Sequence, residues 1–227
     1  KGHIENMKEY GLKSWWNLRN DDIFVHRWGD PEYVRDFINH FQLEHTAGFY
    51  MGSDGYFWGR EFNSKKPDLA GKLEVDKHWY KFMLWGRLAY NNTLDSDFFI
   101  HKIGKHFPEA NAQKLYTVWQ MASKIIPAVN CYHWNDWDYQ WSVEACIDAR
   151  NGFHDVNRFI SNPTLKDSGV LSPKQYAENP KSEKTTPFEI ASQIRSYATK
   201  TLIQVNELQT NSSSVELKSL LEDLQSM

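Results

Sequence analysis

The stretch that decides the fold reads TAGFYMGSDGYFWGREF over residues 46–62 and, after a polar linker, DKHWYKFMLWGRLAYN over residues 76–91. Its start predicts a buried strand that carries Ala47, Phe49 and Met51. The strand opens into a Gly-Ser-Asp-Gly turn at residues 52–55, and tryptophan and charged residues follow directly. An apolar strand that ends in such a turn is typical of the carboxyl end of a barrel strand, where barrel enzymes keep their catalytic groups.

The second half of this stretch predicts a helix over about residues 74–90. We expect its apolar residues to face the protein interior: Trp79, Phe82, Met83, Leu88 and Ala89. The polar segment before it, residues 63–72, contains proline and glycine and predicts a loop over the mouth of a barrel.

Upstream, the pattern alternates between strand and helix. Residues 14–20 predict a short buried strand and residues 21–28 an extended stretch. Asp30-Pro31-Glu32 is a helix start, because Asp caps, Pro suits the first helical position and Glu complements the dipole. We expect that helix to continue to about Phe41, and this order suits parallel α/β units.

Downstream of residue 90 the chain is predicted to be mostly helical, with helices over residues 95–106, 108–126 and from 186 onward. Pro127 is expected to end the second of these. Residues 162–186 are expected to form a long surface connection, and a final helix follows a serine-rich break at 211–214. We therefore predict two domains, residues 1–90 and residues 91–227. The first holds about three strands where a barrel needs eight, so most of the barrel is expected to lie outside this chain.

Composition narrows the class of function. The 227 residues include 41% hydrophobic residues, 15% aromatic residues and 10 tryptophans. Tryptophans stack on sugar rings, but they also fill cores. The net charge of -3 gives no reason to expect a nucleic-acid partner, and no apolar run is long enough to span a membrane. Neither the absence of a signal peptide nor the two cysteines, Cys131 and Cys146, decides the compartment.

The central stretch resembles the end of the barrel in glycoside hydrolase family 67 α-glucuronidases. The matching residues are Gly48, Gly52, Ser53, Asp54, Trp58, Gly59, Gly86, Arg87, Leu88 and Ala89. Tyr90 stands where that family usually has Trp, and Asn92 where it usually has Pro. The resemblance implies the last strands and helices of a (β/α)8 TIM barrel, followed by a mostly helical C-terminal domain.

By that resemblance, the protein is expected to cleave a uronic acid or another sugar side chain from a plant polysaccharide such as xylan. The reaction would be acid/base hydrolysis without a cofactor. The catalytic carboxyl groups of that family lie on earlier barrel strands, so we expect them upstream of this chain. The helical domain is expected either to buttress the barrel or to form a homodimer surface.

Residues at two predicted strand ends are candidates for contacting the sugar. They are Arg27, Trp28, Asp54, Trp58, Arg60 and Glu61. Arg60 suits a uronate carboxylate because a guanidinium binds it in a bidentate fork, but an ordinary ion pair with Glu61 or Asp54 fits as well. Asp54 is equally suited to shaping its own turn, and Trp58 to packing. Asp30 is expected to act as a helix cap.

Metal binding is not expected. The segment His133-Trp134-Asn135-Asp136-Trp137-Asp138 has one histidine and two carboxylates, but its spacing matches no ligand pattern and its tryptophans suit helix packing. Two other classes of protein stay open. One is a non-catalytic carbohydrate-binding barrel, and the other is a helical interaction module whose tryptophans form the core.

Overall fold

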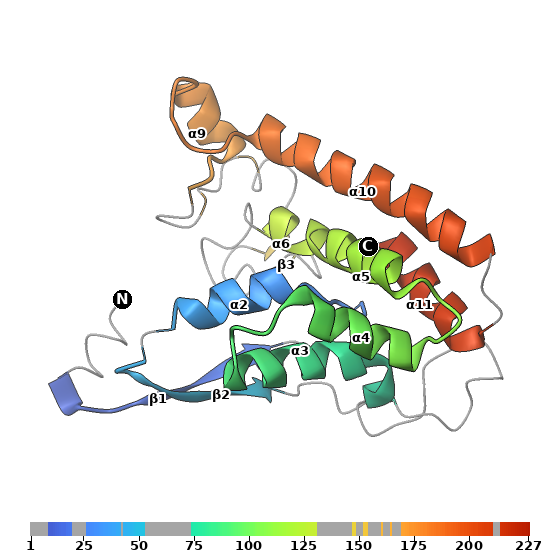
Figure 1. Ribbon diagram of the computed structural model, residues 1–227. Coiled ribbons are helices and arrows are strands. Elements are labelled where there is room, and N and C mark those ends of the chain that lie inside the picture. The colour runs from blue at the N-terminus through green and yellow to red at the C-terminus, as the bar shows by residue number, and fades with distance from the viewer. Residues whose placement is uncertain are drawn as a thin grey trace. The chain divides into compact units, whose positions relative to one another are not determined.

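The computed structural model describes residues 9–19, 26–41, 43–52, 74–130, 147–148, 152–153, 160, 164, 169–210 and 214–227. Its elements are β1 (Ser14–Arg19), α2 (Pro31–Asn39), β2 (Thr46–Gly52), the 3-10 helix η2 (Glu74–His78), α3 (Trp79–Tyr90), α4 (Ser96–His106), α5 (Ala112–Ser123), α6 (Ile125–Asn130), β3 (Ile147–Asp148), β4 (Gly152–Phe153), α9 (Pro173–Glu178), α10 (Pro187–Thr210) and α11 (Val215–Ser226) (Figure 1). The chain divides into two compact units, residues 1–120 with 205–226 and residues 121–204 with 227. The predicted division into 1–90 and 91–227 stays a prediction.

A parallel strand–helix–strand motif opens the first unit. β1 and β2 pair in parallel, with Trp16 opposite Phe49 and Arg19 opposite Gly52, and α2 lies between them in sequence (Figure 1). The predicted strands at 14–20 and 47–51 and their parallel arrangement are thus confirmed, but the first strand is not buried as predicted, because Trp15 is 64% exposed. Phe41, just beyond α2, joins helix to sheet: its ring lies 6.3 Å from that of Trp16 and 6.2 Å from that of Phe49.

The residues of the sheet are more exposed to solvent than the sequence predicts. Ala47 is exposed and Phe49 is only half-buried, so the expectation of a buried strand is wrong for these two positions. Tyr50 is also half exposed, at 50%. Parallel strands are buried when both of their faces are covered, whereas here the aromatic contacts to Phe41 cover one face. Residues 26–28 are not in a strand, and the rest of the expected extended stretch, 21–25, lies outside the described residues.

Helix α2 begins as the sequence predicts. The Asp30 carboxylate accepts a hydrogen bond from the Glu32 backbone N–H at 3.1 Å, and Pro31 occupies the first helical position. Val34 is fully buried, and Phe37 meets Trp85 of α3 edge-to-face at 5.4 Å between ring centroids. The helix ends at Asn39, two residues before the predicted end.

The helix expected over residues 74–90 is present, but its first turn is the 3-10 helix η2, and its buried face differs from the prediction. Its buried residues are Tyr80, Lys81, Leu84, Trp85 and Leu88. Of the predicted set, only Leu88 is fully buried, while Ala89 is exposed. The reason lies in the partners: Trp85 packs against Phe37, and Tyr80 packs against Trp119 at 4.3 Å between ring centroids. Because α3 carries aromatic residues on several of its faces, more than one face is apolar. Periodicity alone therefore does not show which face is buried.

Helices α4 and α5 confirm the sequence pattern, with a correction at the end. Asp95 caps α4 by accepting from the Phe98 backbone N–H at 3.0 Å. The predicted apolar residues of α5 and its continuation are all buried: Leu115, Val118, Trp119, Ala122 and Ile125. Pro127 does not end a helix, because α5 already ends at Ser123 and Pro127 lies in the first turn of α6. A proline is tolerated there, since the first turn has no backbone acceptor for its missing N–H.

In the second unit, the predicted connection over residues 162–186 contains the helix α9. Ser172 and Gln175 form a reciprocal capping box at its start. Helix α10 opens at Thr186 as predicted, because Thr186 and Glu189 cap each other in the same way. Its expected apolar face is wrong at Phe188 and Leu202, which are 71% and 41% exposed.

Two further predictions concern the remaining elements. The tryptophans of residues 133–138, which are expected to suit helix packing, lie outside the described residues. Further along the chain, residues 147–148 form a short antiparallel pair with 152–153. The final helix, α11, is confirmed, with Leu217, Leu220, Leu221 and Leu224 buried.

The part of the chain that the structure describes is mostly helical, with a small parallel sheet. This arrangement is compatible with an α/β enzyme. It does not show a barrel, so the predicted TIM barrel stays a proposal. Among the described residues, no helix combines the length and apolarity that crossing a membrane requires.

Candidate functional site

The carboxyl ends of β1 and β2 mark the place where parallel sheets hold ligands. β1 ends at Arg19 and β2 at Gly52. Four of the predicted site residues follow β2 closely and lie outside the described residues: Asp54, Trp58, Arg60 and Glu61. In the connection between β1 and α2, the described residues are 26–30, which lie directly before α2.

Arg27 is predicted to face the mouth of a barrel, and the structure places its side chain against α11. It is only 4% exposed. Its Nε donates to Asp223 Oδ2 at 2.5 Å and its Nη2 donates to Ser219 Oγ at 2.7 Å. The ion pair and the hydroxyl contact orient the guanidinium from two sides. Arg27 thus connects the segment to a helix whose Asp223 lies 196 residues further along the chain.

Trp28, the second predicted residue of this segment, is packed on α2. It is 9% exposed, and its ring meets that of Tyr33 edge-to-face at 5.3 Å between centroids. Such contacts between aromatic rings add to the gain from burial. The two predicted residues Arg27 and Trp28 are neighbours in the chain, but their side chains have different surroundings.

Asp30 has two roles in the segment. Its Oδ1 caps α2 and also accepts a hydrogen bond from Gln120 Nε2 at 3.1 Å. The expected cap is confirmed, and the contact with α5 is an addition that local sequence does not reveal, since 90 residues separate the two partners.

Close packing of aromatic side chains around position 29 leaves no room for a side chain larger than that of glycine. A Cβ atom at this position would lie 2.5 Å from ring atoms of Tyr80 and 3.1 Å from Nε1 of Trp119. That same indole nitrogen donates a buried hydrogen bond to the backbone carbonyl of Arg27. Burial, followed by the nearby Tyr116 and Asp30, raises the pKa of Tyr80, so its phenol stays protonated.

Two basic side chains near the segment are buried as well. His78 is 2% exposed and Lys81 1% exposed. Burial lowers the pKa of His78 to about 2, with further contributions from the positive charges of Lys81, Lys77 and Arg27. The imidazole is therefore neutral at ordinary pH. Sequence reasoning missed His78, Tyr80 and Lys81 because their burial depends on partners that lie far along the chain.

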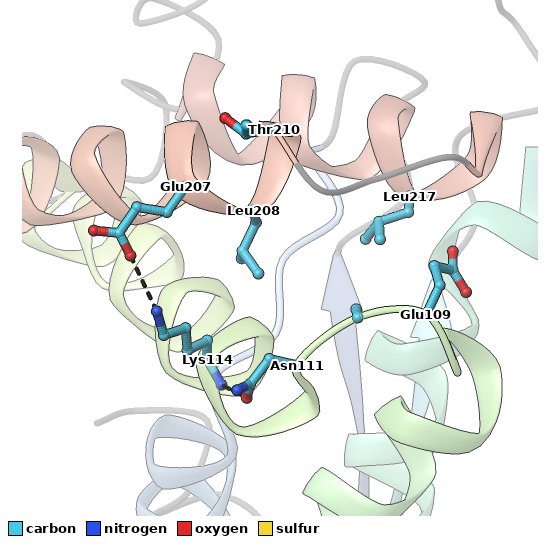
Figure 2. A pocket seen from close by; sticks show the side chains of 8 residues that line it. Glu109, Asn111, Lys114, Glu207, Leu208, Thr210 and Leu217 are labelled. Atoms are coloured by element: carbon cyan, nitrogen blue, oxygen red, sulfur yellow. Dashed lines mark hydrogen bonds and ion pairs between the residues drawn. The ribbon is translucent and has the colours of Figure 1, made fainter.

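An open groove lies elsewhere in the first unit. Its cavity volume is about 740 Å³. Figure 2 shows its walls: the connection between α4 and α5, the end of α10 and the start of α11. Leu208 and Leu217 point into it, while Lys114 binds Glu207 at 3.2 Å between Nζ and Oε2. The groove therefore combines apolar side chains with paired charges. None of its residues is among the site residues that the sequence predicts.

The described residues hold no group of three or more His, Cys, Asp or Glu side chains that could bind a metal ion. The segment 133–138, considered above for a metal, lies outside them. The arrangement around residues 26–30 holds a loop in place at the carboxyl end of the sheet. The buried polar groups of this loop are bound by other parts of the same chain.

Comparisons with known proteins give a likeness in fold. No family model matches the chain, and no curated protein matches it in sequence. Among solved structures, the chain is similar to one described as a GH138 enzyme targeting pectin rhamnogalacturonan II, with a TM-score of 0.70 and 13% sequence identity. The match covers 98% of this chain and 28% of that one, so the chain spans less than a third of the length of the protein it resembles. The chain therefore has a fold like that of part of a glycoside hydrolase.

Proposed function

We propose that the protein is a carbohydrate-active glycoside hydrolase that releases a uronic acid from a plant polysaccharide. The observation that carries the proposal is the fold likeness to a GH138 enzyme along 98% of the chain. A common fold alone does not fix a reaction. The second support comes from the sequence, since the stretch at residues 46–91 resembles family 67 α-glucuronidases.

We infer the type of substrate from these two supports together. The GH138 enzyme targets pectin rhamnogalacturonan II, and a galacturonan is a polymer of galacturonic acid. The α-glucuronidases release glucuronic acid. Both sugars carry a carboxylate at C6, which a guanidinium recognises. Arg60 is the residue that we propose for this contact, with Trp58 as the stacking surface for the ring.

Hydrolysis requires a protonated and an ionised carboxyl group on either side of the scissile bond. We propose that this pair lies on other strands of a (β/α)8 barrel, and that this chain contributes the last strand ends and the helical part. Asp54 and Glu61 then hydrogen-bond sugar hydroxyls beside the pair. Arg27 and Trp28 are buried, so their contribution is made through the loop that they belong to.

The test measures free uronic acid released by the full-length protein. Two substrates separate the two uronic acids: oligosaccharides of rhamnogalacturonan II, and xylo-oligosaccharides that carry glucuronic acid. The variants are Trp58→Ala and Arg60→Ala. Tyr90→Ala is the matched control, because Tyr90 is 91% exposed at the end of α3.

Release by the wild type that falls in both variants but not in the control supports the proposal, and the productive substrate identifies the sugar. Binding of either oligosaccharide without release contradicts hydrolysis and favours the non-catalytic carbohydrate-binding alternative. If neither oligosaccharide binds, the proposal is wrong for both substrate classes.

A further inference from the structure

The segment at residues 26–30 is held by the side chains of two helices that lie far from it in the sequence. From α11, Asp223 and Ser219 bind the Arg27 guanidinium at 2.5 and 2.7 Å. From the same helix, Ser226 Oγ lies 3.3 Å from His26 Nδ1. All of these residues belong to the first unit.

Helix α5 holds the same segment from another direction. The indole N–H of Trp119 donates to the carbonyl of Arg27, and the Gln120 amide donates to the Asp30 carboxylate. In a loop, side chains can bind the backbone groups that other backbone groups would bind in a strand or helix. Side chains of two helices thus bind residues at both ends of the segment 26–30.

Among these contacts of the segment, the ion pair between Arg27 and Asp223 joins a buried charge to a more exposed one. Arg27 is 4% exposed, and the side chain of Asp223 is 35% exposed, so a buried cation depends on a partner that is closer to the surface. Removing the carboxylate of such a pair is costly, because a buried guanidinium then loses its ion-pair partner in a poorly solvated place. The charge of Arg27 also acts on His78, whose pKa is lowered by burial and by the positive charges of Lys81, Lys77 and Arg27.

We propose that Asp223 and Ser219 are positioning residues, which fix the loop after β1 at the carboxyl end of the sheet and so set the geometry of the sugar site. This inference rests on the proposed function. In it, α11 takes part in the site without contacting the substrate. Arg27 connects the loop to α11, and its guanidinium binds Asp223 and Ser219 instead of a uronate.

The experiment compares Asp223→Asn with Asp97→Asn in the full-length protein. Both substitutions convert one aspartate of the first unit to asparagine, and Asp97 is an exposed residue of α4. The first readout is hydrogen–deuterium exchange of the peptide that covers residues 26–30, which does not depend on activity. The second is kcat and KM, measured well below the unfolding temperature of each variant, so that only folded protein is compared. Asp223→Glu, which restores the carboxylate, is the rescue variant.

We expect Asp223→Asn to accelerate exchange in this peptide and to lower kcat by up to about 100-fold with little change in KM. Asp97→Asn is expected to leave both readouts unchanged, and Asp223→Glu to recover part of kcat. Unchanged exchange in Asp223→Asn would overturn the inference, whatever the activity.

Faster exchange with an unaltered kcat would also overturn the positioning role and leave Asp223 with a purely stabilising one. A wild-type protein that releases no sugar from any substrate would contradict the proposed function instead. The exchange readout would then still decide whether α11 holds the loop.

Discussion

The buried histidine at position 78 makes stability depend on pH in a defined direction. Its pKa is lowered from 6.5 to about 2, first by burial and then by the positive charges of Lys81, Lys77 and Arg27. In the unfolded chain the imidazole regains its ordinary pKa. Below pH 6.5 the unfolded state therefore binds one proton that the native state does not bind, and the free energy of unfolding decreases as the pH falls.

The size of the effect follows from the two pKa values. With a native imidazole that stays neutral and an unfolded pKa of 6.5, lowering the pH from 7 to 5 is expected to cost about 2 kcal/mol from His78 alone. A variant at position 78 isolates the contribution of His78 from that of the rest of the protein.

We therefore compare the wild type with His78→Gln, which has no titratable group at this position. Urea denaturation, followed by tryptophan fluorescence, gives the free energy of unfolding at pH 7 and pH 5 for each protein. The variant is expected to be less stable at pH 7, but to lose about 2 kcal/mol less than the wild type on acidification. Equal losses in the two proteins would refute the reasoning, because they would show that His78 takes up its proton in the native state.

Two further predictions concern packing and capping at the same loop. Gly29→Ala is expected to cost about 1–3 kcal/mol of stability in the same denaturation assay, because its Cβ would overlap the Tyr80 ring. The matched control, Gly86→Ala, has open space around the added methyl group and is expected to be neutral or to stabilise α3 by up to about 1 kcal/mol; a similar loss in both would contradict the packing argument. Asp30→Ala is expected to cost at least about 1 kcal/mol, since the cap of α2 and the bond from Gln120 are lost together. An unchanged urea midpoint for Asp30→Ala would show that water replaces both bonds.

The sequence predicts those parts of the fold whose causes are local. Asp30-Pro31-Glu32 specifies the start of α2 within three residues, and Asp95 does the same for α4. Thr186 and Glu189 signal the start of α10. The capping box of Ser172 and Gln175 is also local. It lies in a segment rich in proline, serine and lysine, and that composition predicts a surface connection where α9 is found.

Burial is predicted less well, because it depends on distant partners. Trp85 is buried by Phe37 of another helix, whereas Phe188 at the start of α10 is 71% exposed. The same limit applies to the site. The sequence selected Arg27 and Trp28 from their position after a predicted strand, but the contact of Arg27 with Asp223 spans 196 residues. No local pattern indicates that pair.

The order of synthesis gives the contact between Arg27 and Asp223 a consequence for folding in the cell. At about 5–20 residues per second, roughly 10 to 40 s separate the emergence of these two residues from the ribosome. During this interval the second unit, residues 121–204, is made between the two parts of the first. We therefore expect the loop at residues 26–30 to reach its final conformation only after α11 has been translated, because Asp223 and Ser219 bind Arg27 from that helix. We expect a chain stalled before residue 214 to expose this loop to proteases and chaperones.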